Sequence, residues 1–151
     1  MLKAAELFDR TQLKMCGPVP WGTSVAEAAS GIYVITLADP ASVLVDVLPA
    51  AKRHRWNADQ EIIYIGRATK LSKRLSQFYR HKLGASSPHR GGQDIKLLEA
   101  NTLVYWAISE SFREAEKALI DIFRSEVGQL PFGNKIAAAQ KREKIIPAIL
   151  R

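Results

Sequence analysis

The sequence predicts an α+β fold in which helices flank a small three-stranded antiparallel sheet. Three segments rich in β-branched and aromatic residues indicate the strands, at 31–37, 62–65 and 103–108. Apolar residues that recur at intervals of three and four, between the second and third strands and after the third, indicate the helices. From residue 31 onward the expected order is therefore β-β-α-α-β-α, and the short connections favour an antiparallel sheet.

The 151 residues fit one globular unit made of three parts. Residues 1–30 are expected to form a helix, over 2–14, and an extended arm, both packed on the core. Residues 31–134 form the central domain, and 135–151 contribute a C-terminal helix that Pro147 interrupts. The arm is expected to be irregular because four residues that break regular structure lie in it: Gly17, Pro18, Pro20 and Gly22.

Within the central domain, local signals predict the remaining elements. Residues 41–60 have an apolar middle and a basic end, and predict a loop or an irregular hairpin extension. A basic helix is expected over 70–82, and a short helix over 93–100 after a turn-rich stretch. The last helix is expected to begin at a capping box formed by Ser111 and Glu114, and to stop at Gly128.

Positive charge is concentrated in one stretch of the chain. No acidic residue occurs from 62 to 93, and the 15 basic residues elsewhere balance the 15 acidic ones, so this stretch carries the whole formal net charge of +7. A one-sign segment suggests a phosphate-bearing partner, and the alternative is a solubilising basic face. Its seven basic residues are Arg67, Lys70, Lys73, Arg74, Arg80, Lys82 and Arg90.

Other classes of protein are disfavoured by what the sequence lacks. No apolar run approaches the ~20 residues that span a bilayer, and the charged N-terminal segment lacks the apolar core of a secretory signal. The single cysteine, Cys16, cannot form an intramolecular disulfide or a zinc cluster. We therefore expect a cytoplasmic protein without a membrane partner.

Two tripeptides at strand edges, Gly31-Ile32-Tyr33 and Tyr64-Ile65-Gly66, precede Arg74. This pattern resembles the GIY-YIG nuclease family, which is named for these tripeptides, and the resemblance covers residues 31–134. It implies a small stand-alone member of bacterial or phage type with the family's fold. The implied activity is an endonuclease that hydrolyses phosphodiester bonds in nucleic acid with Mg²⁺ or Mn²⁺; DNA is favoured over RNA as the substrate, and the sequence leaves that choice open.

The resemblance also implies roles for individual residues. Arg74 matches the arginine that stabilises the scissile phosphate, and a planar guanidinium holds two phosphate oxygens at once. Arg67 stands where excision-repair members carry a lysine and keeps the positive charge. Tyr33 and Tyr64 would deprotonate and orient the attacking water, and which of them is the base stays open. The glycines that are expected to have a structural role in the two tripeptides are Gly31 and Gly66.

A glutamate early in the helix that follows the third strand is the family's single protein ligand of the metal. Glu116 falls within the apolar arc of this helix, where a carboxylate is costly unless a cation meets it. The alternative is Glu114, which suits the capping box instead. Asn134 matches a loop asparagine that braces the site. Nucleic-acid contacts are expected from seven further residues: Lys70, Lys73, Arg80, His81, Lys82, His89 and Arg90.

The sequence departs from the family in two places. Thirty residues separate Tyr33 from Tyr64, a connection much longer than is usual in the family, and Phe78 stands where some relatives carry a histidine. The rival interpretation is a non-catalytic nucleic-acid-binding module that retains the basic cleft. Such a module is expected to have lost a catalytic residue, yet all five are present: Tyr33, Tyr64, Arg74, Glu116 and Asn134. The sequence indicates no oligomeric state.

Overall fold

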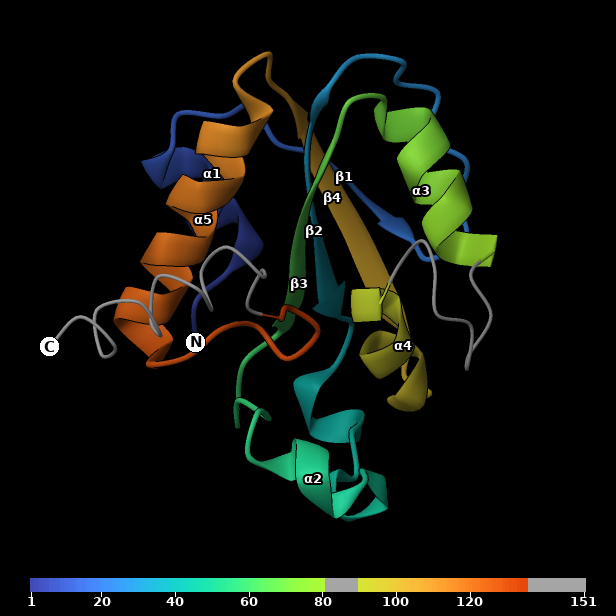
Figure 1. Ribbon diagram of the computed structural model, residues 1–151, viewed down its shortest axis with the longest axis vertical. Coiled ribbons are helices and arrows are strands. Elements are labelled where there is room, and N and C mark those ends of the chain that lie inside the picture. The colour runs from blue at the N-terminus through green and yellow to red at the C-terminus, as the bar shows by residue number, and fades with distance from the viewer. Residues whose placement is uncertain (81–89, 136–151) are drawn as a thin grey trace, which may run out of the picture.

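A computed structural model describes residues 1–80 and 90–135 as an α+β domain built on one antiparallel sheet. Its four strands are β1 (Cys16–Pro20), β2 (Gly31–Leu37), β3 (Ile62–Ala68) and β4 (Thr102–Ile108). They lie in the order β1-β4-β2-β3, so β1 and β3 form the two edges. Figure 1 shows the sheet between two layers of helices. The expected sheet of three strands was therefore wrong by one strand.

The additional strand is β1, in the segment expected to be an irregular arm. Cys16 pairs with Trp106 and Val19 with Val104, with a register shift between the two pairs. A proline cannot donate a ladder hydrogen bond, but an edge strand needs only one bonded side. Pro18 and Pro20 are therefore compatible with β1, although the same prolines would have argued against an internal strand.

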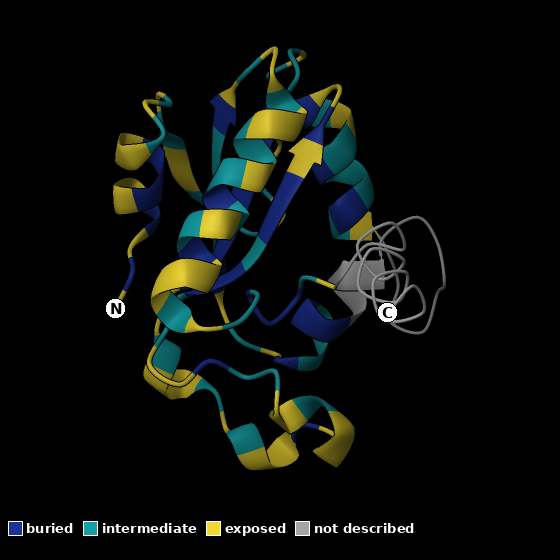
Figure 2. Ribbon diagram, turned by 60° about the vertical axis from the view of Figure 1, so that its left-hand side comes forward, coloured by how far each residue is buried: buried dark blue, intermediate teal, exposed yellow. Residues whose placement is uncertain are grey.

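Helices cover both faces of the sheet (Figure 1). On one face, α1 (Ala4–Arg10) and α5 (Phe112–Val127) bury Leu7, Phe8, Leu119 and Phe123 against the strands. On the other face, α3 (Leu71–Arg80) and α4 (Arg90–Leu97) bury Leu71, Leu75, Phe78 and Ile95. The apolar face that was expected for the basic helix is the face of α3 that packs against the sheet. Figure 2 shows the sheet and the inward faces of the helices buried.

The connection between β2 and β3 is irregular, with short helical turns. It contains two 3-10 turns, Pro40–Ser42 and Val45–Val47, followed by α2 (Ala50–Arg53). Leu48 anchors it in the core, whereas Leu44 is 69% exposed. Figure 2 shows this part of the chain, below the sheet, as largely exposed or half-buried.

Both ends of α5 were predicted, but one for the wrong reason. The Ser111 side chain makes no capping hydrogen bond within the described part of the chain, so the expected capping box does not form. The helix begins instead with the backbone N–H of Ala115 bonded to the Ser111 carbonyl at 2.9 Å. At the other end Gly128 has φ of +103°, which glycine adopts without steric cost, and α5 stops there as expected.

Most of the turn-rich stretch expected over 84–92 and the helix expected over 136–146 lie outside the described residues. The last three residues of that stretch, 90–92, belong to α4, which begins three residues earlier than expected. Within the described ranges, no helix is both long and apolar enough to cross a membrane.

Candidate active site

The register of β2 and β3 places the two tyrosines on one face of the sheet. Tyr33 pairs with Gly66 and Ile35 with Tyr64, but Thr36 pairs with Ile62, so Ile63 is the extra residue of a bulge in β3. Successive side chains of a strand point to opposite faces, and one extra residue reverses this alternation. Tyr64 pairs with Ile35, two residues from Tyr33 and before the bulge is reached, so the regular register already places its side chain on the face that holds Tyr33, and the bulge turns Ile63 to that face as well.

The tyrosine rings form a small aromatic cluster with Phe78. The centroids of the Tyr33 and Tyr64 rings are 5.9 Å apart, and Phe78 lies 5.9 Å from Tyr33 and 5.2 Å from Tyr64. Phe78 is fully buried at the position where some relatives carry a histidine. Packing of the two rings, not acid–base chemistry, is what this side chain supplies.

Both motif glycines allow close approaches that no other residue would permit. A Cβ on Gly66 would lie 2.5 Å from Cζ of Tyr33 and 2.8 Å from Cε1 of Tyr64. A Cβ on Gly31 would lie 2.0 Å from the carbonyl oxygen of Ala107. Gly66 thus makes room for the two rings, and Gly31 lets β2 pack closely beside β4.

Burial raises the pKa of both tyrosines. It raises the pKa of Tyr33 well above its usual value, and the nearby Tyr64 adds to this, while Arg74 opposes it. Burial also raises the pKa of Tyr64, again against the effect of Arg74. The Tyr33 hydroxyl is buried and has no hydrogen-bond partner among the described residues. The arginines alone therefore do not make either phenol a base, and additional positive charge is required.

Arg74 reaches the tyrosines from α3. Its positive charge lowers the pKa of Tyr33, of Tyr64 and of Glu116, so the guanidinium lies within electrostatic range of all three side chains. Its Nε is buried, and no described residue accepts a hydrogen bond from it. A buried N–H without an acceptor is costly, and an anionic ligand that reached the guanidinium would supply the missing acceptor.

Glu116 approaches from α5, on the opposite face of the sheet. Because β3 is an edge strand, side chains from both faces can meet around it. Arg67, in β3, places Nη1 3.3 Å from Oε1 of Glu116. The Glu116 side chain is 21% exposed, and desolvation raises its pKa although Arg67 and Arg74 lower it. The carboxylate is therefore incompletely compensated by cations.

The alternative ligand, Glu114, faces elsewhere. It is exposed and lines an open hollow of about 460 Å³ between α1 and α5, together with Arg10 and Thr11. The side of α5 that carries Glu114 thus points away from the tyrosines, and the geometry favours Glu116 as the candidate metal ligand.

Asn134 extends the sheet at the β3 edge. Its Nδ2 donates to the Ile65 carbonyl at 2.8 Å, and its Oδ1 accepts from the Ile65 N–H at 2.9 Å. The N–H of Gly133 donates to the Ile63 carbonyl at 2.7 Å. The loop therefore satisfies backbone groups that an edge strand leaves open, on both sides of Tyr64.

The expected nucleic-acid contacts are only partly described. Lys70, Lys73 and Arg80 are exposed on or next to α3. His81, Lys82 and His89 lie outside the described residues, and Arg90 begins α4 with a side chain that is not described.

Comparison with known proteins gives one match. The model of the GIY-YIG catalytic domain matches residues 54–129, half of the chain. The chain belongs to the GIY-YIG family. No curated protein and no solved structure shows significant similarity to it. The matched span contains the second tripeptide, Arg74 and Glu116, while the register of β2 and β3 brings the first tripeptide beside it.

Membership of the GIY-YIG family supports an endonuclease and hence a nucleic-acid substrate. The family generally uses divalent metals, and the residues present fit a weakly held ion. The described residues contain no cluster of three or more His, Cys, Asp or Glu that could form a metal cage. A single half-buried carboxylate, Glu116, suits a hard cation that keeps most of its water.

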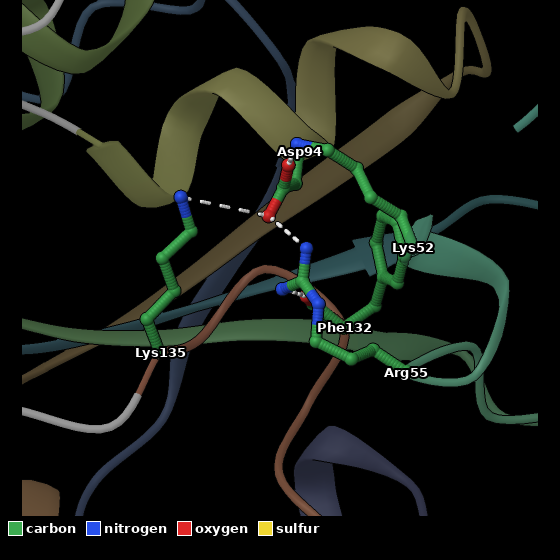
Figure 3. A network of polar contacts seen from close by, with 5 residues as sticks. All are labelled: Lys52, Arg55, Asp94, Phe132 and Lys135. Atoms are coloured by element: carbon green, nitrogen blue, oxygen red, sulfur yellow. Dashed lines mark hydrogen bonds and ion pairs between the residues drawn. The ribbon is translucent and has the colours of Figure 1, made fainter. Parts of the chain in front are cut away.

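Figure 3 shows a second ionic cluster of this GIY-YIG domain, which was not predicted from the sequence. Asp94 is fully buried and forms ion pairs with Lys52 and with Arg55, the latter at 2.7 Å, while Lys135 lies 3.9 Å away. Burial alone would raise the pKa of Asp94, but the hydrogen bonds from Lys52 and Arg55 outweigh it and lower the pKa. The only sequence signal was the basic end of the 41–60 connection, whose partner is distant along the chain.

Proposed function

We propose that the protein is a divalent-metal-dependent endonuclease that hydrolyses phosphodiester bonds in nucleic acid, preferentially DNA. The observation that carries the proposal is the convergence of Tyr33, Tyr64, Arg74 and Glu116 around one edge of the sheet, beside an exposed basic helix. The family match supports the reaction class, and the geometry supports the assignment of residues.

Arg74 is the phosphate clamp of this proposal. Its buried Nε, which none of the described residues engages, would donate to a non-bridging oxygen of the scissile phosphate. Such a contact strengthens as negative charge develops in the transition state. Arg67 lies at the rim and is 46% exposed, so it adds positive charge and orients Glu116.

The two phenols would handle the attacking water. Tyr33 would take its proton and Tyr64 would orient it, or the reverse, since both hydroxyls lie on one face and burial raises the pKa of both. Mg²⁺ or Mn²⁺ held by Glu116 would supply positive charge and polarise a phosphoryl oxygen. A base role for either tyrosine therefore requires the metal to be bound, because the arginines alone do not offset the rise in pKa that burial causes.

The substrate backbone would follow α3. Lys70, Lys73 and Arg80 present exposed cations that bind phosphates without reading sequence. His81, Lys82, His89 and Arg90 would extend this surface. Asn134 would brace β3 beneath the site through its two hydrogen bonds to Ile65.

The decisive experiment is incubation with supercoiled plasmid and single-stranded DNA and RNA oligonucleotides, with Mg²⁺ or Mn²⁺ and then with EDTA. We expect nicking that EDTA abolishes and that Arg74→Lys reduces. Glu114→Gln is the matched control and should cleave like the wild type. Binding without cleavage under all these conditions would favour a non-catalytic nucleic-acid-binding module.

A further inference from the structure

One peptide group beside Tyr64 is held from both sides. The carbonyl of Phe132 accepts a hydrogen bond from Nη1 of Arg55 at 3.0 Å, and the N–H of Gly133 donates to the Ile63 carbonyl at 2.7 Å. These two groups belong to the same planar peptide unit and point in opposite directions. Arg55 and the bulge residue Ile63 therefore fix its orientation together.

The peptide also touches the candidate site directly. A Cβ on Gly133 would lie 3.1 Å from Cδ2 of Tyr64 and 3.0 Å from Cγ1 of Ile95. Gly133 thus packs against the Tyr64 ring on one side and against α4 on the other. Because the bulge residue Ile63 directly precedes Tyr64, the bond from Gly133 to the Ile63 carbonyl bears on the placement of that ring.

Arg55 is itself locked in place. Its Nη2 donates to Asp94 at 2.7 Å, its guanidinium lies 5.3 Å from the centroid of the Phe132 ring, and Lys52 holds the second oxygen of Asp94 (Figure 3). A guanidinium can make both hydrogen bonds at once in fixed geometry, whereas an ammonium is a point charge without this fork. The contact to Phe132 is therefore oriented, not incidental.

The neighbours of Arg55 hold the same loop. The Trp56 and Phe132 rings lie 5.4 Å apart, and Nδ2 of Asn57 donates to the Leu130 carbonyl at 2.9 Å. Three consecutive residues of the connection thus contact the loop before Asn134. Trp56 and Asn57 still hold the loop when Arg55 changes, and Lys52 still pairs with the buried Asp94, so an Arg55 variant is expected to fold.

We propose that Arg55 is a positioning residue of the site, acting through the Phe132–Gly133 peptide on the bulge and the Tyr64 ring. The long connection between the two tripeptides then has a defined task, which is to clamp the loop that braces β3. The kinetic part of this inference rests on the proposed nuclease function, whereas the placement of Tyr64 does not.

The test compares Arg55→Ala and Arg55→Lys with Arg53→Ala. Arg53 is the matched control because it donates to the carbonyls of Leu48 and Asp46 within the connection and does not reach the loop. The readouts are kcat and KM for plasmid nicking, and the ring resonances of ¹³C-labelled tyrosine, with Tyr64 assigned from Tyr64→Phe.

For Arg55→Ala we expect kcat to fall on the order of 10- to 100-fold, because a small misplacement of a catalytic group costs rate, while KM changes by less than about threefold. The Tyr64 resonance should shift. Arg55→Lys should lie between this variant and the wild type, and Arg53→Ala should match the wild type in kcat and in the Tyr64 resonance.

An unchanged kcat and Tyr64 resonance in folded Arg55→Ala would overturn the proposal, as would an equal loss in Arg53→Ala. If the wild type cleaves no substrate, the proposed function fails, and the Tyr64 resonance alone then decides whether Arg55 positions the ring. A Tyr64 resonance that shifts in Arg55→Ala and not in Arg53→Ala would still support the positioning role.

Discussion

Replacing Glu116 with glutamine separates a metal ligand from a structural ion pair. The carboxylate is 21% exposed, and its raised pKa shows that desolvation outweighs the attraction of Arg67 and Arg74. Arg67 is 46% exposed, so its ion pair with Glu116 stabilises the fold by only about 0–1 kcal/mol. Removing the charge is therefore expected to leave the free energy of unfolding unchanged or to raise it by about 1 kcal/mol.

The expected gain depends on pH. A glutamate whose pKa is raised in the folded state contributes most favourably below its unfolded pKa, and this contribution is lost as the pH rises through the folded pKa. Glu116→Gln should therefore match the wild type near pH 4, the ordinary value for glutamate being about 4.3. At neutral pH its melting temperature should be higher by about 0–4 °C, at about 2–4 °C per kcal/mol for a chain of this size.

Two measurements on the same preparations test this reasoning. Thermal unfolding from pH 4 to 8, with and without Mg²⁺, gives stability, and plasmid nicking gives activity. Glu116→Gln should keep its fold, lose Mg²⁺-dependent nicking, and lose any rise in melting temperature that Mg²⁺ causes in the wild type. A Glu116→Gln protein that is destabilised but active would refute the assignment and make Glu114 the candidate ligand.

Three further changes test other parts of the molecule. Arg74→Lys keeps the charge but loses the planar fork, so nicking should fall on the order of 10²-fold while the Kd for substrate changes little; full activity would remove it from the mechanism. Neutralising Lys70, Lys73 and Arg80 together should weaken binding to every sequence alike and flatten the dependence of Kd on salt, and an unchanged salt slope would exclude α3 as the docking surface. Asp94→Asn should cost about 2–4 kcal/mol at neutral pH in chemical denaturation. Because the pKa of Asp94 is lowered in the fold, the wild type should lose this advantage as the pH falls through that pKa, and a constant difference down to pH 2 would contradict the ion-pair explanation.

Local pattern was enough for most of the elements. The β-branched and aromatic content of β2, β3 and β4 is a property of neighbouring residues, and so is the apolar face formed by Leu71, Leu75 and Phe78. The capping box was a wrong prediction from the same kind of evidence. Ser111 and Glu114 have the right spacing, but the Ser111 backbone, with ψ of 51°, departs from the usual cap conformation.

Tertiary structure decided what depends on pairing between distant segments. Whether Pro18 and Pro20 can lie in a strand depends on whether that strand is at an edge, and this follows from the order of the whole sheet. Asp94 was not recognised because its partners, Lys52 and Arg55, lie about forty residues earlier and meet it only in the fold.

The candidate site divides in the same way. The sequence by itself determined which side chains are available, namely the tyrosines, Arg74, Glu116 and Asn134, because their types and order along the chain carry the resemblance. Only the tertiary structure decided that Tyr64 lies beside Tyr33, since this depends on the register in which β2 pairs with β3. It also decided that burial raises the pKa of both phenols, because desolvation depends on what packs around a group and not on its neighbours in sequence.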